Sequence, residues 1–304
     1  MSAPDTSDSA AQGLQRLSIL TLNVHGWHNE EVGSFKALVA MLKEKQPDII
    51  ALQEATKHRV PQLAAALTDG LSEIHWTVTH NCAILSRFPL GVFEASRKLV
   101  GPQREARITG GKGSPRYSVA TVTPCDGVSI EIVCLHLDHV REPTRLVQLR
   151  KLADAQLAPG RGALQIWLGD FNALTQSDVS EKEWQAIAEH RSRNAWEAPV
   201  SDVTSMMSSL PASAKRVQAP RAQPKAACLN FTDCWRAAEQ REGGLGTSRF
   251  GTRIDYIYCT AQLMQRARVA SCEHVQTIPA QISDHNGVLA TLELAPVEIG
   301  RETL

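Results

Sequence analysis

The segment WLGDFN, residues 167–172, constrains this chain more than any other stretch of its sequence. It directly follows the apolar run 163–166. Apolar residues that include β-branched and aromatic types and stop at a glycine are typical of a buried strand that ends in a tight turn. Residues two apart on an extended chain point to the same side, so Asp170 and Asn172 can address one atom together. Strand ends are where rigid scaffolds present chemistry, and this segment therefore predicts a buried sheet with a polar site at its edge.

Other segments along the chain predict further strands and helices around this one. Apolar side chains at helical spacing predict helices over 34–45, 60–67, 143–157 and 180–191. Short apolar runs predict strands over 17–22, 48–52, 81–90, 117–122, 128–137, 254–258 and 287–294. The sequence contains no internal repeat and no domain linker, so a single domain is expected.

The composition is that of an ordinary globular protein. Of the 304 residues, 43% are hydrophobic and 21% are charged, which permits a sizeable core. The formal net charge is zero, which removes any argument from global charge for binding to nucleic acid or membranes. The seven cysteines are scattered without a C-x-x-C pair, and no apolar run approaches the roughly 18 residues of a membrane span. These features predict a soluble intracellular protein with reduced thiols, in the cytoplasm or nucleus, and we expect a monomer.

Three segments are expected to lie outside the folded core. Residues 1–15 are mainly polar and lack a secretory signal, so they are predicted to form a disordered tail. Residues 296–304 are predicted to form a C-terminal tail. Residues 174–227 contain several prolines and the basic stretch Lys215–Lys225, and are predicted to form a surface insertion. The domain proper is therefore expected to span residues 16–295.

Polar side chains occur where the predicted strands end. They are Asn23, Glu54, His136, Asp170 with Asn172, and Asp284 with His285, while Asp255 lies within a further strand. Carboxylate and amide oxygens suit a hard cation such as Mg²⁺, and the cysteine and histidine spacing typical of zinc sites is absent. Histidines beside carboxylates suit proton transfer or transition-state stabilisation near neutral pH. Together these groups fit metal-assisted attack of water on a phosphate ester.

An ordered set of motifs carries a family resemblance over about residues 16–295. The motifs are LNVHGW, PDIIALQE, AILSRFPL, LHLDH, GDFNAL, RIDYIY and SDH, in this order. The set resembles the endonuclease/exonuclease/phosphatase superfamily of DNase I-like enzymes, nearer its tyrosyl-DNA phosphodiesterase and sphingomyelinase side. The resemblance implies the α/β class, as a four-layer α/β sandwich of two packed mixed β-sheets flanked by helices.

The resemblance also implies a metal site. Glu54 would be the principal Mg²⁺ ligand, with Asn23 beside it to help position metal or phosphate. Asp284 would complete the metal environment. Mn²⁺ would be a possible substitute for Mg²⁺.

The remaining motif residues would act on the phosphate. Asp170 would orient and deprotonate the attacking water, and Asn172 would donate to a non-bridging phosphate oxygen. His285 would stabilise the pentavalent transition state, with Asp255 as its paired carboxylate. His136 would be a second phosphate-binding histidine.

Substrate-binding candidates are less sharply marked. Arg116 precedes a strand and could clamp phosphate, or could be a solvated arginine. Trp27 and Phe250 could wall the substrate cleft, since exposed aromatics stack on bases, or could pack in the core. With zero net charge, nucleic-acid affinity would come from a local positive rim formed by Arg87, Arg116 and the stretch Lys215–Lys225. Arg145 and Asp233 are expected to have structural roles.

The sequence is compatible with more than one class of substrate. The inositol polyphosphate 5-phosphatase motif WCDR is absent near residues 253–256, and no hydrophobic hairpin for membrane docking is visible. We therefore expect a Mg²⁺-dependent phosphoesterase that acts on a phosphodiester of nucleic acid, as a nuclease or a phosphodiesterase of 5′ adducts on DNA ends. The alternatives are a sphingomyelinase-type phospholipase C and a catalytically inactive binding module. The intact set Glu54, Asp170, Asn172 and His285 argues against the inactive module.

Overall fold

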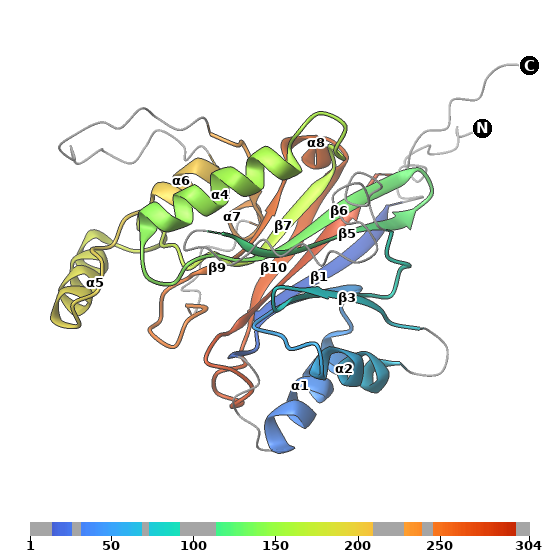
Figure 1. The fold of residues 1–304 in the computed structure, drawn as a ribbon, viewed down its shortest axis with the longest axis horizontal. Coiled ribbons are helices and arrows are strands. Elements are labelled where there is room, and N and C mark those ends of the chain that lie inside the picture. The colour runs from blue at the N-terminus through green and yellow to red at the C-terminus, as the bar shows by residue number, and fades with distance from the viewer. Residues whose placement is uncertain are drawn as a thin grey trace, which may run out of the picture.

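A computed structural model describes residues 14–25, 32–68, 73–91, 114–208, 228–238 and 246–295. Two mixed β-sheets pack face to face, and helices cover the outer face of each sheet (Figure 1). This is the predicted four-layer α/β sandwich. The predicted tails lie almost entirely outside the described residues, as does the stretch Lys215–Lys225.

The first sheet has six strands in the order β10-β11-β1-β2-β4-β3. The strands are β1 (Gln15–Asn23), β2 (Ile49–Gln53), β3 (His75–Thr79), β4 (Cys82–Ser86), β10 (Ala267–Val275) and β11 (Gly287–Leu294). Only β1 and β2 pair in parallel, and α1 (Val32–Lys45) connects them. The other neighbours within this sheet are antiparallel.

The second sheet has five strands in the order β5-β6-β7-β9-β8. The strands are β5 (Arg116–Cys125), β6 (Val128–His136), β7 (Gln165–Asp170), β8 (Thr232–Asp233) and β9 (Asp255–Cys259). Here β6 and β7 form the parallel pair, and α4 (Glu142–Gln156) connects them. Each sheet thus has a central parallel pair with antiparallel strands around it.

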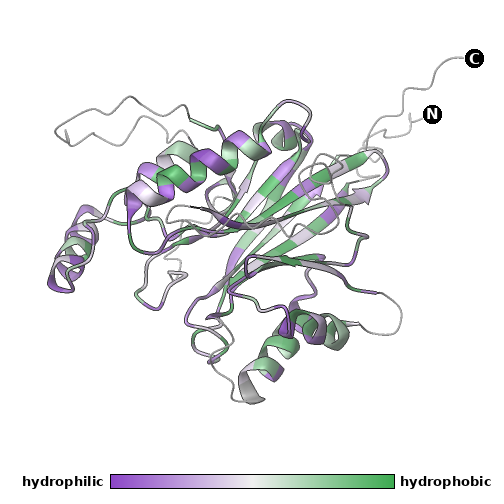
Figure 2. Cartoon of the chain, in the orientation of Figure 1, coloured by the Kyte–Doolittle hydropathy of each residue, from purple (hydrophilic) through white to green (hydrophobic). Residues whose placement is uncertain are grey.

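Alternation of side chains along the strands builds three apolar layers. Between the sheets lie alternate residues such as Ile49 and Ala51 of β2 and Ile130 and Ile132 of β6, all fully buried. The intervening residues of the first sheet pack against α1 and α2 (Arg59–Leu67). Those of the second sheet pack against α4 and α6 (Asp202–Met207). The central strands are buried on both faces and rich in hydrophobic residues, and they show green bands interrupted by purple ones (Figure 2).

The described part of the predicted insertion is divided between surface and core. After η2 (Gln176–Asp178), α5 (Glu181–Arg193) begins with a capping box between Ser180 and Glu183, and none of its residues, all of them described, is buried. By contrast, Val203 and Met207 of α6 are fully buried against the second sheet. Residues 202–207 therefore belong to the core, which differs from the expected surface insertion.

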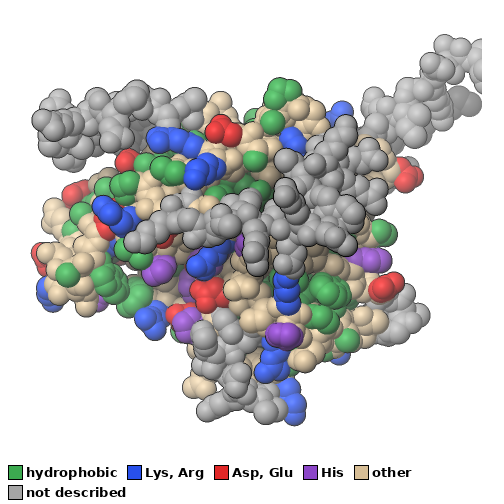
Figure 3. Space-filling model, in the orientation of Figure 1, with side chains coloured by type: hydrophobic (Ala, Val, Ile, Leu, Met, Phe, Trp, Pro, Cys, Tyr) green, Lys and Arg blue, Asp and Glu red, His purple; other side chains and the backbone are tan. Residues whose placement is uncertain are grey.

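Short helices pack against β10 of the first sheet, and the first of them also contacts β8 and β9 of the second. They are α7 (Cys234–Ala237) and α8 (Ala261–Met264). No helix in the described ranges combines the length and apolar character that crossing a membrane requires. All seven cysteines are described, and each is a free thiol. In Figure 3, histidine, acidic and basic side chains gather on the lower left of the visible face, beside exposed hydrophobic side chains.

Candidate active site

The polar strand ends meet at one edge of the sandwich because of the strand directions. The parallel strands β1 and β2 end side by side with Asn23 paired to Gln53, and β6 and β7 end with His136 paired to Asp170. The antiparallel β9 starts at the same edge, where Asp255 pairs with Asp170. The antiparallel β11 starts there too, directly after the segment 283–286. Both sheets therefore contribute side chains to one site, as the sequence predicted.

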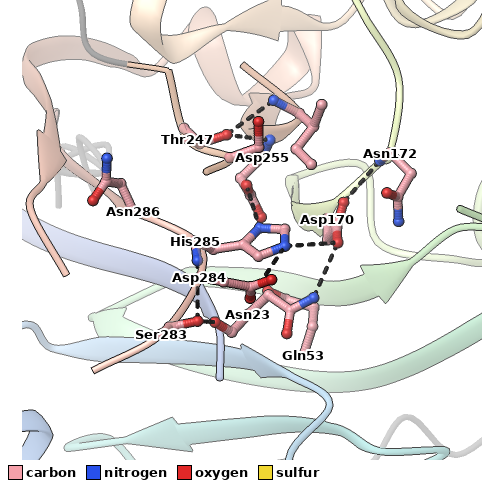
Figure 4. A network of polar contacts seen from close by, with 12 residues as sticks. Asn23, Gln53, Asp170, Asn172, Thr247, Asp255, Ser283, Asp284, His285 and Asn286 are labelled. Atoms are coloured by element: carbon pink, nitrogen blue, oxygen red, sulfur yellow. Dashed lines mark hydrogen bonds and ion pairs between the residues drawn. The ribbon is translucent and has the colours of Figure 1, made fainter. Parts of the chain in front are cut away.

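Asp170 lies at the centre of this site and is 1% exposed. Its Oδ2 accepts a hydrogen bond from Nδ2 of Asn23 at 3.0 Å. The same oxygen lies 3.6 Å from Nε2 of His136. It also lies 3.9 Å from Nε2 of His285 (Figure 4). Its other oxygen, Oδ1, accepts from the backbone N–H of Asn172 at 2.8 Å. One buried carboxylate oxygen is thus surrounded by three nitrogen atoms from different strands and loops.

The glycine before Asp170 is required by the close approach of two backbones. Gly169 has φ +142°, and a Cβ atom built there would lie 2.0 Å from the carbonyl oxygen of Leu135 on β6. No side chain fits at that distance, so only glycine allows β7 to end this close to β6. The glycine of the WLGD segment thereby fixes where Asp170 lies relative to His136.

A charged pair connects His285 to Asp255. Nδ1 of His285 lies 2.9 Å from Oδ2 of Asp255, whose side chain is fully buried. Burial raises the pKa of Asp255 to about 6, although the charge of His285 opposes this shift. Burial lowers the pKa of His285, but the carboxylates of Asp255, Asp170 and Asp284 outweigh burial and raise this pKa to about 10. At neutral pH the pair is therefore ionic, and Nε2 of His285 carries a proton toward Asp170.

Three residues predicted to hold the metal lie at the same edge. Nδ2 of Asn23 donates to Oε1 of Glu54 at 3.2 Å as well as to Asp170. Asp284 places Oδ1 3.2 Å from Nδ1 of His25 and Oδ2 3.9 Å from Nη1 of Arg249. Glu54 has φ +57°, a left-handed conformation that turns the chain directly after β2.

The donor set fits a hard divalent cation. The carboxylates of Glu54, Asp170, Asp255 and Asp284 converge there, and a bound cation would offset their mutual repulsion. Oδ1 of Asp255 is buried and accepts no hydrogen bond from the other described residues. Asp170, Asp255 and His285 also place ligand-type atoms within 4.8 Å of one another.

The profile of the Endonuclease/Exonuclease/phosphatase family matches residues 20–285, most of the chain. The chain belongs to this family. As a member it is a metal-dependent phosphoric ester hydrolase. Among the curated proteins no match was found.

Solved structures of this family share the fold. An endonuclease/exonuclease/phosphatase from Bacteroides vulgatus is 17% identical with a TM-score of 0.60, covering 92% of this chain and 99% of that one. A family protein from Leptotrichia buccalis is 18% identical with a TM-score of 0.57, covering 91% and 100%. The structure of D. rerio TDP2 complexed with single-strand DNA product is 17% identical with a TM-score of 0.54, covering 91% and 99%.

Three further predicted residues, His136, Arg116 and Asn172, lie at this edge of the second sheet. Burial lowers the pKa of His136, so at neutral pH this histidine is largely uncharged, although Asp170 and Glu54 oppose the shift. Arg116 pairs with His136 across β5 and β6, and its side chain is exposed. Asn172 has φ +49°, and its Nδ2 donates to the carbonyl of Leu137 at 3.2 Å.

Of the residues predicted to line the substrate, one is exposed, one lies outside the described residues and one lies away from the site. Phe250 is 50% exposed, while Trp27 lies outside the described residues. Arg87 directly follows β4, whose last residue pairs with Ile49 at the start of β2, so Arg87 lies at the opposite end of the sheet from Glu54. Including Arg87 in a positive rim was therefore wrong, because the antiparallel direction of β4 carries it away from the site.

Two residues of the site, Ser283 and Thr247, were not predicted from the sequence. Ser283 donates to the carbonyl of Asn23 at 2.6 Å and accepts from the backbone N–H of His285, so it joins β1 to the histidine. Thr247 accepts from the backbone N–H of Asp255 at 3.0 Å. The SDH motif contained a signal for Ser283, whereas nothing in the spacing marks Thr247.

Proposed function

We propose that this chain is a Mg²⁺-dependent phosphodiesterase that hydrolyses a phosphodiester of nucleic acid or a 5′ adduct on a DNA end. The observation that carries the proposal is the environment of Asp170 Oδ2, which lies within 4 Å of Asn23, His136 and His285. A base that accepts a proton and an imidazolium that donates to an oxyanion then lie 3.9 Å apart.

The chain's own residues supply the proton transfer and the phosphate contacts. Asp170 accepts a proton from the attacking water, while the N–H of Asn172 holds its second oxygen in place. His285, fixed by Asp255, donates from Nε2 to the phosphoryl oxygens as their negative charge increases. His136, uncharged at neutral pH, contacts a further phosphate oxygen.

Glu54 and Asp284 would hold the divalent cation, and Asn23, which donates to Glu54, would orient that carboxylate. When bound, Mg²⁺ offsets the charge of the phosphate and of the leaving group. Mn²⁺ has the same preference for oxygen ligands and is expected to substitute. Asp255 is less suited to be a ligand, because its Oδ2 is already held by His285 at 2.9 Å.

A nucleic-acid substrate is supported by two observations. Arg116 is exposed on the strand position opposite His136, where a phosphate on the substrate would meet a positive charge. The related fold of D. rerio TDP2 was solved with single-strand DNA product. A lipid substrate needs a contiguous apolar surface. Among the exposed large hydrophobic residues of the described ranges, only Trp196 and Phe250 have rings in contact with each other.

A panel of phosphodiesters tests the proposal. Single-stranded and duplex oligonucleotides, a DNA strand with a 5′-tyrosyl adduct and sphingomyelin in detergent micelles would be incubated with Mg²⁺, Mn²⁺ or EDTA. We expect turnover of an oligonucleotide or the adduct with either metal and none with EDTA. Efficient hydrolysis of sphingomyelin without activity on the nucleic acids would favour the lipid alternative instead.

A further inference from the structure

Two exposed aromatic side chains touch each other on the surface. Trp196 is 43% exposed and Phe250 is 50% exposed, and their ring centroids lie 5.2 Å apart at an interplanar angle of 75°. The ring of His190 contacts both, with centroids at 5.6 Å from Trp196 and 6.0 Å from Phe250. Single exposed aromatics need no explanation, whereas exposed rings in contact with each other form a continuous apolar surface that a flat ligand could cover. We call these three residues the aromatic cluster.

The aromatic cluster adjoins the candidate active site through the segment 246–252. The backbone N–H of Arg249, next to Phe250, donates to the carbonyl of Asp284 at 3.1 Å. Within the same segment, Thr247 accepts from the backbone N–H of Asp255. Ser248 forms a β-bridge with His285. Phe250 is therefore fixed beside the backbone that carries His285.

Two arginines give the aromatic cluster a positive charge. The guanidinium of Arg249 lies 4.9 Å from the ring centroid of Phe250, and its Nη1 lies 3.9 Å from Oδ2 of Asp284. Arg191 lies 5.9 Å from the ring centroid of Trp196. Flat rings with cations at their side match a nucleotide, which joins a flat base to a negative phosphate.

The residue next to Trp196 is anchored to the core. Oε2 of Glu197 accepts from Nη2 of Arg145 at 3.0 Å and from the backbone N–H of Glu142 at 2.7 Å. Arg145 is 3% exposed and also donates to Glu142 at 2.7 Å. Arg191 donates to the backbone carbonyl of Glu197. An exposed ring on an anchored segment is pre-organised, which lowers the entropy that a ligand must overcome.

We propose that Trp196 and Phe250 form a stacking subsite for one unpaired nucleobase next to the scissile phosphate. The inference rests on the proposed function and names a feature of its substrate. A base that stacks on these rings must be free of its own stack, so the chain acts on single strands or on unpaired ends in preference to closed duplex. Arg249 lies between the base and the metal site, where it can contact the intervening phosphate.

The test compares binding to two strands of equal length and charge. One is a fluorescent oligothymidylate, and the other carries abasic sugars throughout, so that only the bases differ. Anisotropy is measured in EDTA, where no cleavage occurs. We expect the wild-type protein to bind the thymidylate strand more tightly, and Trp196→Ala or Phe250→Ala to weaken that binding between about 5- and 150-fold, the range for loss of one stacked base. Binding of the abasic strand should not change.

Matched variants separate stacking from general damage. Trp76 on β3 is also 43% exposed, so Trp76→Ala removes an equally exposed ring remote from the cluster and should leave both affinities unchanged. Phe250→Tyr keeps a ring and should keep the preference for bases. Equal binding of the two strands by the wild-type protein, or an unchanged preference in Trp196→Ala, would overturn the inference.

Cleavage with Mg²⁺ distinguishes failure of the subsite from failure of the proposed function. Oligonucleotide cleavage with the same KM in wild type and Trp196→Ala would overturn the subsite and leave the function standing. Hydrolysis of bis(4-nitrophenyl) phosphate without binding or cleavage of any oligonucleotide would overturn both. A raised KM with nearly unchanged kcat in Trp196→Ala supports both.

Discussion

His285 and Asp255 form a buried charged pair in which Nδ1 lies 2.9 Å from Oδ2. The Asp255 side chain is fully buried and lies on a central strand, so it cannot follow the ring if the ring moves. The pair therefore fixes the imidazole with Nε2 directed at Asp170, 3.9 Å away. The consequences of this arrangement can be measured in variants.

Asp255→Asn keeps the shape of the side chain and removes its charge. His285 then loses the partner that fixes its ring and its proton, and we expect kcat to fall by about a hundredfold or more. KM should change little, because Asp255 is not placed to touch substrate. Steady-state kinetics check this, with Asp48→Asn at the far end of β2 as a control that keeps kcat. A kcat within about fivefold of wild type would contradict the pairing role.

Asp170→Asn removes the proposed base and one charge of the carboxylate cluster. We expect kcat to fall by about a hundredfold or more with substrate binding largely kept. Since fewer like charges then repel one another, the melting temperature in EDTA should stay equal or rise. Calorimetry and kinetics on the same preparation check both expectations. A large drop in melting temperature would show that the carboxylate stabilises the fold.

Glu54→Gln tests the metal site directly. The loss of one charged ligand from a site with few ligands should weaken Mg²⁺ binding and abolish most activity while the fold survives. Titration calorimetry measures the affinity. Glu273→Gln is the matched control, because Glu273 is 49% exposed and pairs with Lys45 away from the site. Unchanged Mg²⁺ affinity in Glu54→Gln would reject this assignment.

Gly169→Ala tests the close approach of β7 to β6. A Cβ atom would lie 2.0 Å from the carbonyl of Leu135, so the strands must separate and Asp170 must move. We expect a lower melting temperature and a lower kcat together. Gly160→Ala is the control for backbone strain alone, because Gly160 also has a positive φ, +88°, but nothing lies within 4 Å of its Cβ position. Equal effects of the two substitutions would show that the contact with Leu135 is unimportant.

Met207→Ala tests whether α6 belongs to the core. Met207 is fully buried against the second sheet, and its truncation should lower the free energy of unfolding by about 2–5 kcal/mol. Urea denaturation measures this. Gln185→Ala on the exposed α5 should change the same free energy by less than about 0.5 kcal/mol. If Met207→Ala changed the free energy of unfolding only slightly, α6 would be part of a surface insertion and not of the core.

The sequence was informative where a strand has strong local character. The central strands are apolar on both faces and end in polar residues, so β1, β2, β6 and β7 and the edge they share could be predicted. The edge strands β3 and β10 could not, because each is only partly buried and their sequences mix polar with apolar residues. Predicting which polar ends meet required the motif order, because spacing alone does not show that residues 147 apart form a hydrogen bond.

Other features that the sequence did not predict depend on tertiary packing. Helix α6 begins shortly after Pro199, and only its contacts with the second sheet show that it is buried. Trp196 carries no local sign of being exposed beside Phe250, since that contact joins residues far apart in the chain. The predicted roles of Glu54, Asp170 and His285 remain predictions, although the geometry brings all three residues to one edge.

The hydrogen bond between Asn23 and Asp170 joins one sheet to the other, since Asn23 ends β1 and Asp170 ends β7. A folding intermediate in which each sheet had formed, but the two had not yet docked, would have native-like secondary structure and no assembled site. During refolding, catalytic activity should therefore return later than the far-ultraviolet circular dichroism signal, so that activity reports the docking of the two sheets.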